Sequence, residues 1–169
     1  VSGIWAGITS TVALAREGVT LVLRETRGAD DNHDLLLDPS SGVDIAFMQG
    51  GVAHHSPDKG IVMLASLYFE PLWIFHHDAA AYKGINEFAG LKIAIGLPGS
   101  GTRAFVLPLL AANGITPANA TFLEVGSEES LRLLAAGEAD IAMLVGGGAM
   151  EAIQRALRNP DVKLMSVPR

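Results

Sequence analysis

Short apolar runs alternate along the chain with amphipathic segments. The runs have the length and composition of strands and cover residues 19–24, 43–48, 61–68, 72–76, 91–95, 121–125, 141–145 and 162–167. Helices are predicted between them at residues 32–38, 102–113, 127–136 and 150–158, with one helical turn at 86–90. Ser127 is the expected N-cap of its helix. Strands that alternate with helices predict an α/β fold with mainly parallel sheets.

One strand of this pattern occurs twice. The ten residues from Asp44 to Ala53 share six identities with the ten residues from Asp140 to Ala149, 96 positions later. Each copy follows a short Leu-rich segment. A repeat of this length is too long for a solenoid and predicts two similar α/β lobes in one chain. Two lobes create a cleft, and small-molecule sites lie preferentially at such interfaces.

The composition excludes several classes of function. The net charge is −6, which argues against a surface for nucleic acids or anionic membranes. The chain has no cysteine, so zinc–thiolate sites, cysteine nucleophiles and disulfides are ruled out. No signal peptide is recognisable in a sequence that begins at Val1, and no apolar run is long enough to span a bilayer.

Candidate chemistry is concentrated where the strand at 91–95 meets the helix at 102–113. The connecting residues include Gly99, Ser100, Gly101, Thr102 and Arg103. A glycine-rich loop that opens a helix exposes backbone N–H groups at the positive end of the helix dipole. Arg103 adds a planar fork suited to a carboxylate. The spacing resembles a nucleotide-binding P-loop without its lysine, so we predict an anion site without nucleotide chemistry; the alternative is a tight turn whose glycines serve geometry alone.

Polar or glycine residues also follow both copies of the repeated strand. Gln49 and Gly50 follow the first copy and Gly146 follows the second. Ligands of open α/β sheets bind at the carboxyl ends of strands, and glycine allows close approach. Gln49 is a polar side chain that ends an apolar strand and needs a partner. A tight turn explains Gly146 equally well. Tyr68 is a further candidate because it precedes the expected connection between the lobes.

Neither a catalytic set nor a metal site can be recognised. Ser100 lacks a recognisable His/Asp arrangement, and its neighbours do not match the nucleophile elbow. The five histidines include the adjacent pairs His54–His55 and His76–His77, which do not have the spacing of metal ligands. We therefore expect no catalytic residue, no metal and no cofactor, and a protein that is not an enzyme.

Three segments together resemble a known family. Residues 64–75, 91–102 and 137–142 look like the TAXI family of solute receptors from TRAP transporters, a branch of the type II periplasmic binding proteins. The resemblance covers roughly residues 18–168. It implies a two-lobed receptor that captures a small carboxylate-bearing solute, such as an amino acid or organic acid. The solute would be captured outside the cytoplasmic membrane, in the periplasm or an equivalent space, and delivered to the subunits of a membrane permease.

The resemblance also suggests roles for residues and a domain division. It implies that the loop from Gly99 to Arg103 holds the anionic group of the solute, with Gln49, Gly50, Tyr68 and Glu70 contributing from the first lobe and the crossover. Residues 1–70 would form a truncated first lobe and residues 71–169 a complete second lobe. A truncated lobe would leave apolar strands uncovered, so a homodimer is expected through it. Two other functions remain open, namely a ligand-sensing domain of a regulator or receptor kinase and an enzyme built on the same scaffold.

Overall fold

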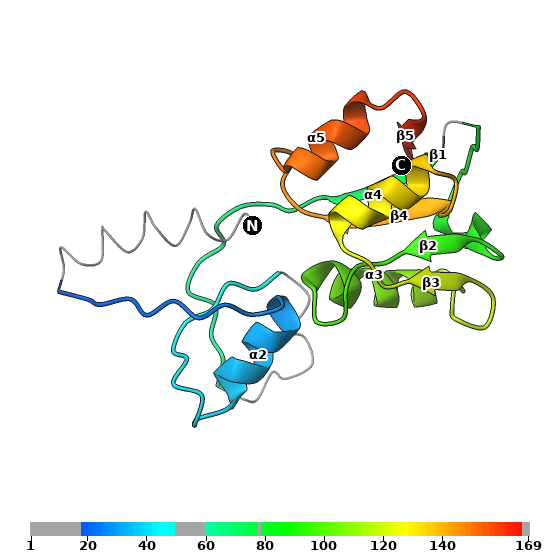
Figure 1. The fold of residues 1–169 in the computed structure, drawn as a ribbon. Helices are drawn as coiled ribbons and strands as arrows, with labels where there is room; N and C mark the ends of the chain where they lie inside the picture. Colours follow the sequence, from blue (N-terminus) through cyan, green and yellow to red (C-terminus); the bar gives the residue numbers. More distant parts are fainter. Residues whose placement is uncertain (1–17, 50–59, 78, 167–169) are drawn as a thin grey trace.

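A computed structural model describes residues 18–49, 60–77 and 79–166 of the chain. Its elements in chain order are α2 (Ala29–Leu37), β1 (Leu72–His77), the 3-10 helix η2 (Ile85–Phe88), β2 (Lys92–Ala94), α3 (Gly101–Ala112), β3 (Thr121–Leu123), α4 (Ser127–Ala135), β4 (Ile141–Val145), α5 (Glu151–Arg158) and β5 (Val162–Leu164) (Figure 1). No helix in these ranges is long and apolar enough to cross a bilayer.

The five strands in the described part of the chain form one sheet in the order β3-β2-β4-β1-β5. β2 pairs in parallel with both β3 and β4. β1 is inserted antiparallel between β4 and β5, with Leu72 opposite Val145 and Phe75 opposite Leu164. Four strands therefore run in one direction and one runs against them, which confirms the predicted α/β class with a mainly parallel sheet.

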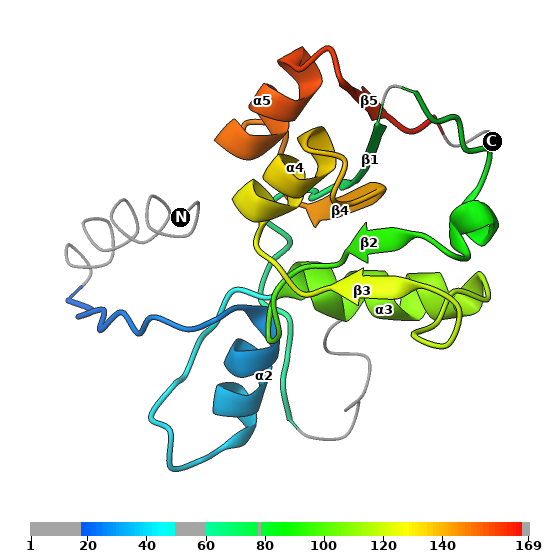
Figure 2. The ribbon, with the colours of Figure 1, turned by 45° about the vertical axis from the view of Figure 1, so that its right-hand side comes forward.

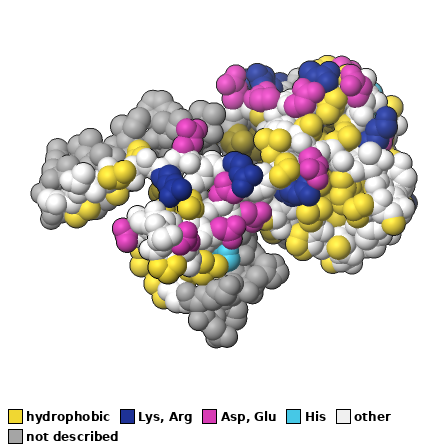
Figure 3. Space-filling model, turned by 60° about the horizontal axis from the view of Figure 1, so that its bottom comes forward, with side chains coloured by type: hydrophobic (Ala, Val, Ile, Leu, Met, Phe, Trp, Pro, Cys, Tyr) yellow, Lys and Arg dark blue, Asp and Glu magenta, His cyan; other side chains and the backbone are white. Residues whose placement is uncertain are grey.

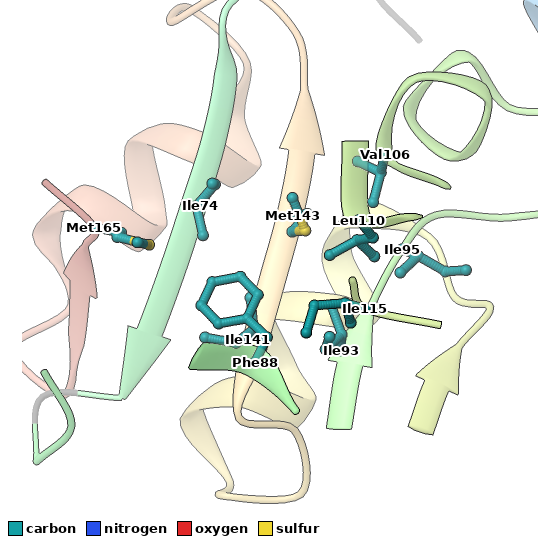
Figure 4. Close-up of a cluster of buried hydrophobic side chains, with 10 residues drawn as sticks. All are labelled: Ile74, Phe88, Ile93, Ile95, Val106, Leu110, Ile115, Ile141, Met143 and Met165. Carbon is teal, nitrogen blue, oxygen red and sulfur yellow. The ribbon is translucent and has the colours of Figure 1, made fainter. Parts of the chain in front are cut away.

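Helices cover both faces of the sheet, with α3 on one side and α4 and α5 on the other (Figure 2). Successive strand residues point to opposite faces, so Ile93 faces α3 while Ala94 faces α4 and α5. The core on the α3 side contains Val106 and Leu110 from α3 together with Phe88 from η2 (Figure 4). Burial of both faces explains why the strands appear in the sequence as continuous apolar runs.

The described residues before β1 form one helix and no strand. The strands predicted at 19–24, 43–48 and 61–68 are wrong, because none of these segments has a ladder partner among the described residues. Ile45 is 68% exposed and Phe47 57% exposed, although the repeated sequence is buried in β4. High β-propensity favours an extended chain, but a strand also needs a neighbour. The sheet expected for the first lobe is therefore not formed in these ranges.

The start of α2 and the N-cap of α4 differ from the sequence prediction. α2 begins at Ala29 rather than at residue 32, after Gly28 as its N-cap. α4 begins at Ser127, and Gly126 rather than Ser127 is its N-cap. Glycine is an accepted N-cap residue, so the position of the serine alone did not determine where this helix starts.

Candidate functional site

The loop between β2 and α3 is shaped by glycines and capped by a serine. The Oγ of Ser100 accepts a hydrogen bond from the backbone N–H of Arg103 at 3.2 Å, which makes Ser100 the N-cap of α3. Gly96 has φ +91°, and a Cβ there would lie 2.9 Å from the Ser100 Oγ. Only glycine fits this turn without strain. The loop therefore presents the first turn of α3 in a fixed orientation.

The N-terminus of α3 differs from those of the other described helices in its charge. Acidic residues occupy the first turn of α2, of α4 and of α5, where they oppose the positive end of the helix dipole. The first turn of α3 contains no acidic residue. The positive end of this dipole is therefore not neutralised by its own helix, which is a favourable environment for an external anion.

Thr102 connects this helix start to the central strand. Its Oγ1 accepts a hydrogen bond from the backbone N–H of Val145 at 3.3 Å. Val145 is the last residue of β4, which pairs in parallel with β2; Ala94, the last residue of β2, lies opposite Ala142. The first turn of α3 thus lies at the carboxyl ends of parallel strands, the edge at which open α/β sheets bind ligands.

The N-terminus of a second helix approaches the same loop. Gly28, the N-cap of α2, has φ 146°, and a Cβ there would lie 2.9 Å from the carbonyl oxygen of Gly99. Arg27 hydrogen-bonds the Asp31 carboxylate at 2.7 and 2.8 Å, and both side chains lie against Gly99. The Arg27 guanidinium lowers the pKa of the Asp31 carboxyl below its ordinary value. Two helix starts therefore meet at this loop, and Asp31, one of the two acids in the first turn of α2, is already paired with Arg27.

Two candidates from the first part of the chain reach the same place. The side chain of Gln49 lies over Gly101, so that a methyl group added at Gly101 would overlap its amide. Its Nε2 donates a 2.7 Å hydrogen bond to Oε2 of Glu70. The segment before Gln49 is held to α2, because Asn32 Nδ2 donates to the Phe47 carbonyl oxygen at 2.8 Å. The structure thus brings together Gln49, Glu70 and Gly101, which were selected separately from the sequence.

Arg103 is engaged with a neighbouring carboxylate. Its guanidinium forms an ion pair with Glu124, the residue that follows β3. Basic and acidic side chains are interspersed where the part that contains α2 meets the part that contains the sheet (Figure 3). The Arg103 guanidinium therefore belongs to the first turn of α3, where the anion is expected, but it is already paired with the Glu124 carboxylate.

Gly146 and Tyr68 have no hydrogen bond to the first turn of α3 among the described residues. The carbonyl oxygen of Gly146 accepts a 2.9 Å hydrogen bond from Trp73 Nε1, and the Met150 side chain fills the space beside its Cα. Tyr68 is 65% exposed, with no hydrogen bond to a described residue. Gly50 lies outside the described residues, as do His54 and His55. In the ranges that the structure covers, no group of His, Asp or Glu is arranged to hold a metal ion.

Sequence reasoning missed the contribution of α2. Gly28 is followed by Asp30 and Asp31, and a glycine before two acids is a recognised signal for a helix start. That signal predicts where the helix begins. It does not predict that this helix start meets the loop before α3, because the contact joins positions about 70 residues apart.

The chain belongs to the NMT1-like family, whose sequence profile matches residues 3–169. No curated protein matches it.

Several solved structures of periplasmic binding proteins are similar to the chain. The aliphatic sulphonate binding protein SsuA from Escherichia coli is 16% identical with a TM-score of 0.48, over 58% of this chain and 32% of that one. The alkanesulfonate-binding protein SsuA from Xanthomonas axonopodis pv. citri, bound to MOPS, is 20% identical with a TM-score of 0.45, over 59% and 35%. A periplasmic binding protein from Brucella ovis with glutathione bound is 16% identical with a TM-score of 0.47, over 59% and 30%. The chain spans about a third of the length of these proteins.

Proposed function

We propose that this chain is part of an extracytoplasmic solute-binding receptor that holds a small anionic solute at the first turn of α3. One observation carries the proposal: this helix start lies at the carboxyl ends of parallel strands and has no acid of its own. Ser100, Gly101 and Thr102 would supply the donors. Binding without chemical conversion is favoured, because the site offers anion-binding groups rather than a nucleophile with a base.

The resemblance to the TAXI receptors suggests which anionic group the solute carries and which type of transporter receives it. We propose that the anionic group is a carboxylate and that the receptor delivers its solute to the subunits of a TRAP-type permease. Arg103, Gln49, Gly50, Tyr68, Glu70 and Gly146 remain proposed contributors to binding. The division at residue 70 and a homodimer through residues 1–70 belong to the same proposal. A sensor domain would bind a solute in the same way and would differ in what the full gene product attaches to it.

Calorimetry with the intact chain tests the binding role. The titrants are sodium salts of short carboxylates and sulfonates, with sodium chloride as the reference. The informative variant is Thr102→Val, which keeps the shape of the side chain but removes the hydroxyl donor. We expect it to weaken anion binding about tenfold, the effect of one hydrogen bond to a charged group.

Thr102→Ser is the matched control because it retains the hydroxyl. It should bind anions as the unmodified chain does. If no carboxylate or sulfonate binds more tightly than chloride, the proposed function is wrong. If carboxylates and sulfonates bind equally well, the result supports the anion site but contradicts the proposed preference for carboxylates.

A further inference from the structure

The charged side chains at the loop before α3 do not balance. Contacts bring two arginines and three carboxylates to residues 99–103, namely Arg27, Arg103, Asp31, Glu70 and Glu124. Each arginine forms an ion pair with one carboxylate, Arg27 with Asp31 and Arg103 with Glu124. The surroundings of the proposed anion site therefore carry one negative charge in excess, and that charge belongs to Glu70.

Glu70 is held near the start of α3 without being neutralised. Its Oε2 accepts a 2.7 Å hydrogen bond from Gln49 Nε2, and the Gln49 side chain lies on Gly101. An amide carries no charge, so Gln49 positions the carboxylate but does not balance it. No lysine, arginine or histidine of the described residues forms an ion pair with Glu70. Glu70 is also only partly exposed, so solvent and salt screen its charge less than that of a surface carboxylate.

The start of α3 can compensate one negative charge. The backbone N–H of Arg103 is bonded to Ser100 Oγ, whereas those of Gly101 and Thr102 have no acceptor among the described residues. These donors lie at the positive end of the helix dipole, which is equivalent to about half an elementary charge. One anionic group is therefore well accommodated. A second one on the same solute would meet arginines that are already paired and a carboxylate that is not.

The hollow beside this loop has the same excess of negative charge. It has a volume of about 300 Å³ and borders the loop through Arg27 and Asp31, which line it and also lie against Gly99. Its other charged lining residues are Arg24, Glu25 and Asp34. Three carboxylates thus face two arginines, and a second anionic group is disfavoured on this side as well.

We propose that Glu70 is a specificity-determining residue, which restricts the site to solutes with a single anionic group and excludes dianions. The inference rests on the proposed function, because it assumes that the anionic group of the solute lies at the first turn of α3. Glu70 need not touch the solute, since repulsion between like charges acts over several ångströms. An uncompensated like charge that rejects the wrong ligand is a general route to specificity.

Pairs of solutes that differ by one charge test this proposal in the intact chain. Succinate is compared with succinamate, glutarate with glutaramate, and sulfoacetate with its amide, because an amide keeps the shape of a carboxylate and removes its charge. Calorimetry at neutral pH and an ionic strength of about 0.01 M should show the monoanion of at least one pair binding about tenfold more tightly. Raising the ionic strength to about 0.3 M should shrink this ratio, because salt screens the repulsion. The salt series uses the unmodified chain, so it does not depend on the folding of a variant.

Two variants assign the effect to Glu70. Glu70→Gln should bring the ratio of affinities within about threefold by improving the binding of the dianion. Asp161→Asn is the matched control, because it removes the same charge from an exposed position just before β5. β5 begins opposite His77, at the far end of β1 from Leu72, which pairs with Val145, so Asp161 lies at the opposite edge of the sheet. This substitution should leave the ratio unchanged, and circular dichroism confirms that each variant is folded.

The outcomes separate this inference from the function on which it rests. Dianions that bind as tightly as monoanions in every pair would overturn the exclusion of dianions and leave the anion site intact. A ratio that does not respond to salt, that survives Glu70→Gln, or that Asp161→Asn lowers equally would show that the charge of Glu70 is not its cause. If neither member of any pair binds more tightly than chloride, the proposed function itself fails.

Discussion

Gly28 and Gly99 approach so closely that a Cβ on Gly28 would lie 2.9 Å from the carbonyl oxygen of Gly99. The contact joins the start of α2 to the loop before α3. Gly28 also has φ 146° and ψ −156°, a backbone conformation that is essentially confined to glycine. Both the close approach and the backbone conformation therefore require glycine at this position.

Gly28→Ala is expected to separate α2 from the α3 loop. The backbone conformation of this position would cost alanine about 1–3 kcal/mol. The added Cβ would also clash with backbone atoms, and moving a side chain cannot relieve that clash. Hydrogen exchange should show weaker protection in α2, with the sheet unaffected, and solute binding should weaken. Gly42→Ala is the control, because Gly42 has φ +69° but no atom within 4 Å of an added Cβ. Equal effects of both substitutions would mean that the contact with Gly99 is unimportant.

Arg103→Ala is expected to weaken solute binding by about 1.5–3 kcal/mol, the range for hydrogen bonds to charged groups. Glu124→Gln should strengthen binding, because it releases the guanidinium from its present partner. Calorimetry measures both changes. An unchanged Kd for Arg103→Ala would remove this side chain from the site and leave Ser100, Gly101 and Thr102 as the donors.

The Arg27–Asp31 pair predicts a pH dependence at the start of α2. The folded pKa of Asp31 is lowered by the side-chain hydrogen bond from Arg27, so the pair stabilises the fold above the ordinary value of 3.8. This contribution is lost as the pH falls through the lowered folded pKa. A carboxyl-carbon NMR titration should place the Asp31 pKa below 3.8, and Arg27→Gln should raise it. A pKa that does not respond to Arg27→Gln would show that the pair does not form in solution.

The two copies of the repeat should differ in their sensitivity to substitution. Ile141 is fully buried in β4, whereas its counterpart Ile45 is 68% exposed. Ile141→Ala should lower the free energy of unfolding by about 2–5 kcal/mol, the cost of removing buried side-chain volume. Ile45→Ala should change it by less than about 0.5 kcal/mol, as expected of a surface position. Urea denaturation measures both, and a large effect at Ile45 would mean that this segment is covered in solution.

Exposed apolar side chains before β1 predict self-association. They include Val22 at 89%, Met63 at 84% and Phe69 at 94% exposure. Apolar patches on extended segments recruit partners. Sedimentation at micromolar concentration should show a dimer, and Phe69→Ser should shift it toward the monomer. A monomeric unmodified chain would contradict the proposed homodimer.

The sequence predicted the region after residue 71 well and the region before it poorly, for a physical reason. Runs such as 91–95 and 141–145 find their strand neighbours within the same region, so local propensity and tertiary packing agree there. Runs such as 43–48 have the same composition but no neighbour in the described residues, and propensity alone does not make a strand.

The candidate site was predictable in part. The loop from Gly99 to Arg103 carries a local signal, because glycines before a helix have a recognisable spacing. Gln49 and Glu70 were each selected from the sequence, but their hydrogen bond was not, since it depends on how two distant segments fold together. The same is true of the Arg103–Glu124 pair.

The antiparallel insertion of β1 affects the order in which the chain can fold during synthesis. β1 is made before the other strands of its sheet, yet its two neighbours, β4 and β5, are the last two of them to be made. The ribosome must therefore add both neighbouring strands before β1 can pair. Until then the apolar residues of β1 have no strand partner, among them Trp73, Ile74 and Phe75. Long-range pairing of this kind is slow and exposes apolar surface in the meantime. The nascent chain should accordingly depend on a chaperone for longer than a sheet assembled in sequence order would.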